Sequence, residues 1–471
     1  MNQRALAWFG LLTIVEALFV VTGGRAAMQT IASFDALHHL THLPTLPILV
    51  PWCAQSASLL LGLVWGFVLV VAFCGWQLSR ALAQDQAPIA RLLTFQIVAG
   101  AVLSLAAFSF STDIYNYVVW GRLAGLDHMN PYLAMPPLNP SADRSIGLSL
   151  LATGNPPPRD DYGPLWTAMA AVLARINVGT SLWWQLWSHR AVSVISSAAA
   201  SIALLRILRN YEVRERVGRV ALFAFHPVVL YESAVGGHND MLMLAFAAWS
   251  FAIVDDLPLI AGILIGASIA VKYVSVVLLP FMLVKLFRRD KMAAALMFAA
   301  ALAVIAICFV PFWAGTQTLA AAFSRTGVMA MSPTWVLSRL FPFGVAVPRL
   351  VEIGLALVAL AIIVEALFAF WKTPRARFIW RSISAVVLLS PVLQPWYATW
   401  LSPAIAARGR WAVFAWWLGV LVFLRYALDS GVFGPCNLSA WPLLAIAAAI
   451  VVIPVAAALA ARQSALQQSP D

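Results

Sequence analysis

Long apolar runs separated by short polar loops are the feature that most constrains this chain. Of its 471 residues, 62% are hydrophobic and only 10% are charged. A soluble domain carries about 25% charged residues, so this chain must use lipid as part of its solvent. The runs show no alternation with a period of two residues. Because backbone groups inside a bilayer must be hydrogen-bonded within the spanning segment, we predict an all-α, polytopic transmembrane protein.

About fourteen apolar segments can be proposed as crossings. Several are shorter than the roughly 20 residues that a straight span needs, so we expect those to be tilted, paired or broken. The predicted crossings lie at about 6–24, 56–78, 92–110, 183–207, 219–236, 240–254, 257–271, 273–287, 292–312, 347–371, 380–394, 396–407, 411–428 and 438–460.

Basic residues concentrate in alternate loops between these segments. The net charge is +11, and the cations gather at 80–91, 206–219, 285–291, 372–381 and 408–410. This is the positive-inside pattern, which places these loops and both termini in the cytoplasm and explains the charge without nucleic acid.

Two further apolar stretches, 164–178 and 328–346, would invert every later loop if they crossed the membrane. We therefore predict interfacial helices within outer loops for both. The chain is expected to form a single integral membrane domain over 1–471, with N-terminal helices over 1–110, an outer loop over 111–182 and the remaining helices over 183–471.

Asp113 follows the third predicted crossing and stands near the start of the outer loop 111–182, with Tyr115 just beyond it. An acid at this place can cap a helix at the membrane surface. The alternative is a general base in a membrane-bounded cleft, where partial desolvation tunes the proton affinity of a carboxylate.

Other polar residues of the same loop also allow two interpretations. Arg122 and Tyr132, the latter in an Asn-Pro-Tyr turn, either shape the loop or contact substrate. Asp160 and Asp161 either join Arg159 in a solvated charge cluster or bind a metal or a cationic partner. The acids form no DxD motif, and the four cysteines form no CxxC pair, so we predict no metal and no cofactor.

The remaining candidates lie on the same predicted outer side. His238, Asn239 and Asp240 form either a polar hairpin or a grip on sugar hydroxyls. Lys272, between two crossings, either reaches the interface or binds a lipid phosphate. Three aromatic or amide residues that interrupt an apolar run fit an aromatic belt or a sugar-stacking platform; they are Gln394, Trp396 and Tyr397.

The order of these motifs resembles the GT-C glycosyltransferase superfamily. DIYNYVVWGR and NPY are followed by DYGPLW, GGHNDMLM, a VKY lysine and SPVLQPWY. Within the superfamily the chain looks most like bacterial polyprenol-phosphate-mannose-dependent α-mannosyltransferases, including the α-1,6-mannosyltransferases of actinobacterial lipoglycan synthesis. The match runs from about Asp113 to Trp400, although two extra crossings precede the loop that carries Asp113.

The resemblance implies an inverting sugar transfer at the outer membrane face. The donor would be a polyprenyl phosphate sugar, and the acceptor a glycan or lipid-linked molecule. Asp113 would be the general base, while Lys272 and Arg122 would stabilise the leaving phosphate. The other candidates would bind sugar or acceptor, namely Tyr115, Tyr132, Asp160, Asp161, His238, Asn239, Asp240, Gln394, Trp396 and Tyr397.

The competing class is a transporter or flippase of lipid-linked sugars. Such a protein would also be multi-helical, with broken helices and a buried lysine beside its substrate path. The sequence shows no clear internal repeat, and its candidate polar residues collect on one predicted face. Both features favour an enzyme.

Overall fold

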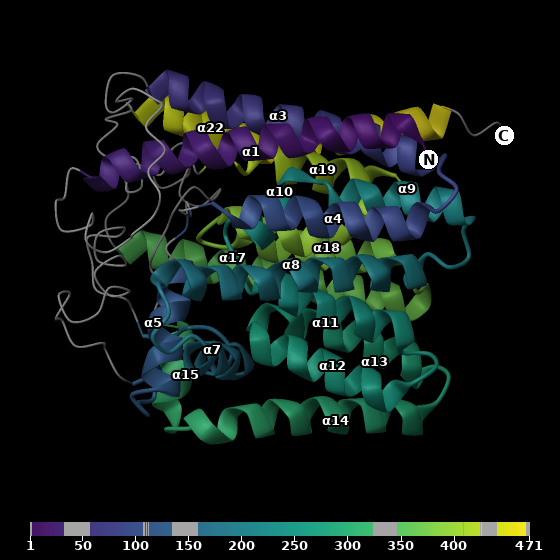
Figure 1. Cartoon of the computed structure of the whole chain (residues 1–471). Helices are drawn as coiled ribbons and strands as arrows, with labels where there is room; N and C mark the ends of the chain where they lie inside the picture. Colours follow the sequence, from purple (N-terminus) through teal and green to yellow (C-terminus); the bar gives the residue numbers. More distant parts are fainter. Residues whose placement is uncertain are drawn as a thin grey trace.

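A computed structural model shows the chain as a bundle of helices (Figure 1). It describes residues 2–32, 57–106, 109, 111, 113–133, 159–323, 346–407, 409–423, 425 and 440–467. Within these residues the regular elements are α-helices and short 3-10 helices, and none is a β-strand. The all-α class is confirmed.

The helices coincide with the apolar segments of the sequence. In chain order they are α1 (Gln3–Ala32), α3 (Ala57–Leu82), α4 (Pro88–Ser104), α5 (Asp113–Gly125), α7 (Pro164–Ile176), α8 (Leu182–Ile207), α9 (Val213–Ala224), α10 (Pro227–Ala234), α11 (Asp240–Ile253), α12 (Pro258–Val271), η2 (Tyr273–Leu278), α13 (Leu279–Phe287), α14 (Lys291–Phe309), η3 (Val310–Phe312), α15 (Thr316–Phe323), α17 (Ala346–Lys372), α18 (Ala376–Leu389), η4 (Pro395–Ala406), α19 (Arg410–Leu421) and α22 (Ala440–Gln467).

Some of these helices are long and apolar enough to span a bilayer by themselves. In the described part of the chain there are four, at Gln3–Val20, Leu182–Ile207, Lys291–Phe312 and Leu350–Lys372. Shorter apolar helices accompany them. The fold is that of a membrane protein, and fourteen crossings stay a prediction.

Several predicted crossings are broken, and prolines explain where. The segment 219–236 divides into α9 and α10 at Pro227, which has no N–H to continue the helical ladder. His226 caps the new helix, since its Nδ1 accepts a hydrogen bond from the Val228 N–H at 3.2 Å. The segment 396–407 is the 3-10 helix η4, with Pro403 inside it.

Glycines let pairs of helices approach closely. A Cβ on Gly121 or Gly125 of α5 would collide with carbonyl oxygens of α7, at Ala170 and Ala171. Small residues four positions apart are the usual means of close packing between membrane helices. The helix expected at 164–178 is therefore confirmed as α7, and its interfacial position stays a prediction. The second such stretch, 328–346, lies outside the described residues except for its last residue.

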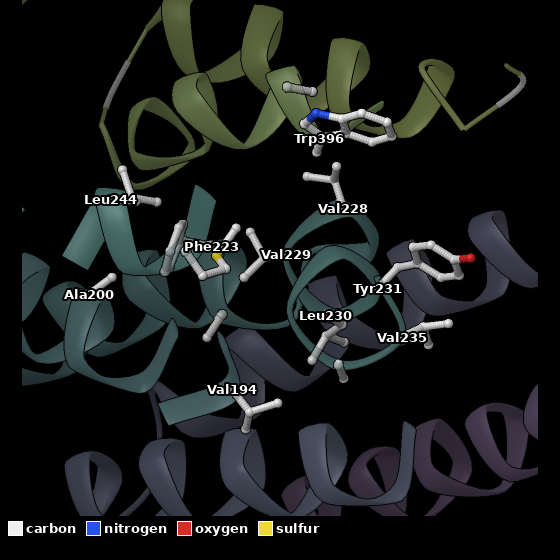
Figure 2. Close-up of a cluster of buried hydrophobic side chains, with 14 of the residues drawn as sticks. Val194, Ala200, Phe223, Val228, Val229, Leu230, Tyr231, Val235, Leu244 and Trp396 are labelled. Carbon is white, nitrogen blue, oxygen red and sulfur yellow. The ribbon is translucent and has the colours of Figure 1, made fainter. Parts of the chain in front are cut away.

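Helix α10 lies in the middle of the bundle, and all eight of its residues are buried. Figure 2 shows Val228, Val229, Leu230 and Tyr231 of this helix, with Val235 just after it, lying between Trp396 of η4 and Val194 of α8. This short helix brings Glu232 into the interior and ends where the loop to α11 begins.

The two ends of the bundle differ in character. The start of α1 and the end of α22 lie at one end, whereas α5, α7 and α15 gather at the other (Figure 1). Loops at the end with the termini are joined by ion pairs. Asp255 lies 2.6 Å from Lys285 Nζ and 2.9 Å from the Arg289 guanidinium, and Asp256 lies 2.9 Å from Arg206. The loops with the basic clusters thus meet at the end opposite α5 and α7.

Candidate active site

Asp113 is the first residue of α5 and its side chain is buried. The Tyr162 hydroxyl donates a hydrogen bond of 2.5 Å to Asp113 Oδ2. The backbone N–H of Asp113 donates to Ser111 Oγ at 3.2 Å. A hydroxyl that donates to a carboxylate oxygen makes a short, strong hydrogen bond, so this contact fixes the position of the Asp113 side chain.

Tyr162 is itself held by a hydrogen-bonded frame. Its N–H donates to Asp160 Oδ1 at 2.9 Å, and the Thr167 hydroxyl donates to Asp160 Oδ2 at 2.6 Å. The Tyr132 and Tyr273 hydroxyls both donate to the Tyr162 carbonyl, at 2.9 and 3.0 Å. Burial raises the pKa of Tyr132, and the Asp160 carboxylate raises it further, so this hydroxyl keeps its proton. Asp160 and Tyr132 therefore position the hydroxyl that contacts Asp113.

The next residue fixes this frame to α12. The Gly163 N–H donates to the Val271 carbonyl at 3.1 Å. A Cβ on Gly163 would overlap the Ala270 carbonyl, so only glycine allows this approach. Lys272 follows directly, which places its side chain beside Tyr162.

Lys272 lies inside a box of aromatic rings. Its Nζ is 5.0, 5.6 and 5.5 Å from the ring centroids of Tyr162, Tyr397 and Trp400. It also donates to both carboxylate oxygens of Asp240 at 2.8 Å, and the Trp400 indole N–H donates to the same carboxylate. Cation–π contacts and a paired carboxylate together stabilise an ammonium group with an exposed fraction of only 12%.

His238 and Asn239 occupy the loop between α10 and α11. The His238 ring stacks on Trp396 with centroids 4.2 Å apart, and its Nδ1 is 3.8 Å from Asp113 Oδ2. Burial lowers the pKa of His238 to about 4; the nearby carboxylates oppose this effect and Lys272 adds to it. The ring is therefore neutral at neutral pH. Asn239 Oδ1 accepts from the Tyr117 hydroxyl at 3.5 Å.

Four of the predicted site residues lie away from Asp113, His238 and Lys272 or at the edge of the group that these three form. Arg122 comes nine residues after Asp113, about half a turn around α5, and its Nε lies 3.6 Å from Asp127. Gln394 accepts a hydrogen bond from the Arg425 guanidinium. Tyr115 is buried on α5, and Asp161 is half-buried next to Tyr162.

Several contributors were not predicted as site residues, among them Tyr162, Trp400, Glu232 and Arg190. Tyr162 stands inside the DYGPLW motif, but nothing in its spacing indicates a partner for Asp113. Glu232 and Arg190 carried a usable signal, because an ionisable residue within an apolar segment is a functional candidate by default. Arg190 donates from Nε to the Val235 carbonyl at 3.1 Å and from a terminal guanidinium nitrogen to the Ser104 carbonyl at 3.1 Å, which fixes the loop that carries His238.

The arrangement combines a buried carboxylate, a neutral imidazole and a caged ammonium group at one end of the bundle. A carboxylate can accept a proton from a hydroxyl, and an ammonium group can attract a phosphate. Among the described residues, no cluster of three or more His, Cys, Asp or Glu side chains could hold a metal ion.

An all-α bundle with these buried polar groups near one end agrees with the predicted GT-C glycosyltransferase class. The family model described as Alpha-(1->6)-mannopyranosyltransferase, N-terminal domain, matches residues 8–288, more than half of the chain. The chain belongs to this family. It is 25% identical to Alpha-(1->6)-mannopyranosyltransferase A of Mycobacterium tuberculosis, over 90% of this chain and 87% of that protein. No solved structure matches.

Membership of this family confirms the predicted resemblance and the predicted enzyme class. The protein is a GT-C glycosyltransferase of the membrane. The roles of its individual site residues stay predictions.

Proposed function

We propose that the protein transfers a mannosyl residue from a polyprenyl phosphate donor to a hydroxyl of a glycan or lipid-linked acceptor, with inversion at the anomeric carbon. The family and the name of the mycobacterial relative support mannose as the sugar and an α-1,6 linkage. The basic loops at the opposite end of the bundle support a site on the outer face, with both termini cytoplasmic.

The observation that carries the proposal is the contact of one tyrosine with both reactive groups. Tyr162 donates to Asp113 through its hydroxyl, and its ring packs against the Lys272 ammonium group. The carboxylate contacts the hydroxyl of this tyrosine, and the cation contacts its ring. Transfer between a hydroxyl and a sugar phosphate can use both groups, the carboxylate to accept the proton and the cation to stabilise the phosphate.

The proposed reaction uses both the Asp113 carboxylate and the Lys272 ammonium group. The acceptor oxygen forms a bond to the anomeric carbon as its proton passes to Asp113, and the bond from that carbon to the phosphate oxygen breaks. The polyprenyl phosphate gains negative charge as it leaves, and Lys272 stabilises that charge. Because the leaving phosphate needs little protonation, a second carboxylic acid is not required at this step, in contrast to a glycoside hydrolase.

The sugar would contact side chains close to the aromatic rings that surround Lys272. Asn239, Trp396 and Tyr397 stand next to His238 or Lys272, and their amide and ring faces suit sugar hydroxyls and the apolar face of a pyranose. We place Arg122 outside the phosphate site, because its side chain lies near Asp127 on the far side of α5.

The test is transfer by the purified enzyme from polyprenyl phosphate mannose to a mannosyl acceptor. Asp113→Asn is expected to lower the rate by about 10²–10⁴-fold, the usual contribution of a general base. Asp127→Asn is the matched control, since it makes the same change on an exposed acid just after the end of α5. Full activity of folded Asp113→Asn would overturn the assignment of the base. Movement of a lipid-linked sugar across vesicles without glycosidic bond formation would favour the transporter.

A further inference from the structure

Starting from Asp113, the site contains a row of three ionisable side chains, Asp113, His238 and Glu232. Asp113 Oδ2 is 3.8 Å from His238 Nδ1, and His238 Nε2 is 3.4 Å from Glu232 Oε2. The exposed fractions of the three side chains are 5%, 0% and 0%. Among the described residues, neither ring nitrogen of His238 has a hydrogen-bond partner. Each nitrogen is thus near one carboxylate, at a distance that a small shift would close.

The His238 ring is held in this orientation from three directions. It stacks on Trp396, with an angle of 21° between the ring planes. Its backbone N–H donates to the Glu232 carbonyl at 3.0 Å, and its carbonyl accepts from the Ser193 hydroxyl at 2.7 Å. Burying an imidazole between two acids costs desolvation free energy. An arrangement that is costly and yet held by several contacts is expected to have a function.

Gly236 provides the space in which the ring and the second acid meet. A Cβ at this position would lie 2.5 Å from His238 Cδ2 and 2.9 Å from Glu232 Oε2. A side chain there would force the two groups apart. The glycine therefore preserves the contact between His238 and Glu232.

The charges that face His238 come from four elements. They are Asp113 at the start of α5, Glu232 of α10, Asp240 at the start of α11 and Lys272 just after α12. Burial dominates among these influences and keeps the imidazole neutral. A neutral imidazole has one nitrogen that accepts a proton and one that donates, as a proton carrier requires.

We propose that Asp113, His238 and Glu232 form a buried proton relay, in which Glu232 takes up the proton that leaves the acceptor. This inference rests on the proposed role of Asp113 as base. The acceptor hydroxyl gives its proton to Asp113, Asp113 passes it to His238 Nδ1, and the proton on His238 Nε2 moves to Glu232. Asp113 is again a carboxylate, His238 is neutral in its other tautomer, and Glu232 is a carboxylic acid. After the products leave, Glu232 gives its proton back through the same row to the solvent.

The relay accounts for a difficulty of the buried base. A protonated Asp113 with an exposed fraction of 5% has little contact with water, and it remains beside the new glycosidic oxygen to which it could return its proton. Moving the proton to Glu232 separates it from the bond just formed. Glu232 acts through His238 and is a positioning residue rather than a group that touches substrate.

The test compares Glu232→Gln with Glu16→Gln, a matched change of a fully buried glutamate on α1. Glu232→Gln is expected to lower kcat by about 10–100-fold, with the KM for polyprenyl phosphate mannose changed less than about twofold. The pH dependence of kcat and its solvent deuterium isotope effect should change as well, which a purely structural role would not produce. Glu16→Gln should leave all of these at the wild-type values.

Glu232→Asp keeps a carboxylate but lengthens the gap to His238, so it should recover part of kcat and retain an altered isotope effect. Glu232→Asp also provides the test of the relay if Glu232→Gln does not fold. Wild-type kcat, pH profile and isotope effect in a folded Glu232 variant would overturn the relay. That result, together with an inactive Asp113→Asn, would leave the proposed function intact. An active Asp113→Asn would instead refute the base itself.

Discussion

Lys272 and Asp240 form an ion pair whose partners are unequally buried, and this asymmetry leads to a prediction about stability. The Asp240 side chain has no exposed surface, whereas 12% of Lys272 is exposed and three aromatic rings surround its ammonium group. Removing the lysine leaves a carboxylate in the interior that accepts a hydrogen bond from the Trp400 N–H. Removing the acid leaves a cation that still has ring contacts and access to water.

The magnitude follows from the geometry. At the N–O distance of 2.8 Å, the Coulomb attraction is about 6 kcal/mol for an effective dielectric constant of about 20. Breaking a buried pair by removing one partner typically costs about 3–5 kcal/mol. We expect Lys272→Met to cost about that amount and Asp240→Asn only about 1–2 kcal/mol, because asparagine can still accept from Trp400. The double variant should be close to Asp240→Asn alone.

The measurement is the free energy of unfolding in detergent micelles, from denaturant titration followed by tryptophan fluorescence. A double-mutant cycle then gives a coupling energy of about 3–5 kcal/mol between the two positions, equal to the cost of Lys272→Met alone. Two results would refute the reasoning. One is an Asp240→Asn variant at least as unstable as Lys272→Met, and the other is a double variant whose loss equals the sum of the two single losses.

Two further predictions concern the frame and the imidazole. Gly163→Ala should lower the free energy of unfolding by about 1–3 kcal/mol, because the added Cβ would overlap the Ala270 carbonyl. The control is Gly354→Ala on α17, where the added Cβ meets open space. This control should be neutral or slightly stabilising in the same denaturant titration. His238 has a pKa of about 4 in the folded protein, below its ordinary value of 6.5. Between these two pH values the unfolded chain therefore binds more protons than the folded protein. The free energy of unfolding consequently falls as the pH drops from 6.5 to 4. His238→Gln should remove roughly 3 kcal/mol of the difference in stability between pH 7 and pH 4, and an unchanged pH dependence would contradict the neutral buried ring.

Composition and periodicity were sufficient to predict the helices. An apolar segment has few ways to satisfy its backbone other than a helix, so each predicted segment coincides with one or two helical elements. The broken segments were harder to place, because a proline marks where the ladder ends but gives no direction for the next helix. The change from α9 to α10 at Pro227 turns Glu232 into the core, and that turn depends on packing against α8 and η4.

The sequence predicted some residues of the site but not the contacts between them. Asp113, His238 and Lys272 stand out because charged or polar residues are rare at such places in an apolar chain. Their partners come from distant segments: Tyr162 is 49 residues from Asp113, and Trp400 is 160 residues from Asp240. Pairing at such separations is decided by tertiary packing, which a single sequence does not encode in any local pattern.

The backbone hydrogen bond from Gly163 to Val271 has a consequence for how such an enzyme can diversify. It joins the neighbour of Tyr162 to the neighbour of Lys272, so main-chain atoms hold the segments of these two residues together whatever side chains surround them. Substitutions elsewhere around the site can therefore accumulate without separating these segments. Under the roles proposed above for Asp113 and Lys272, a lineage built on this frame can exchange its acceptor while it keeps the groups that act on the donor.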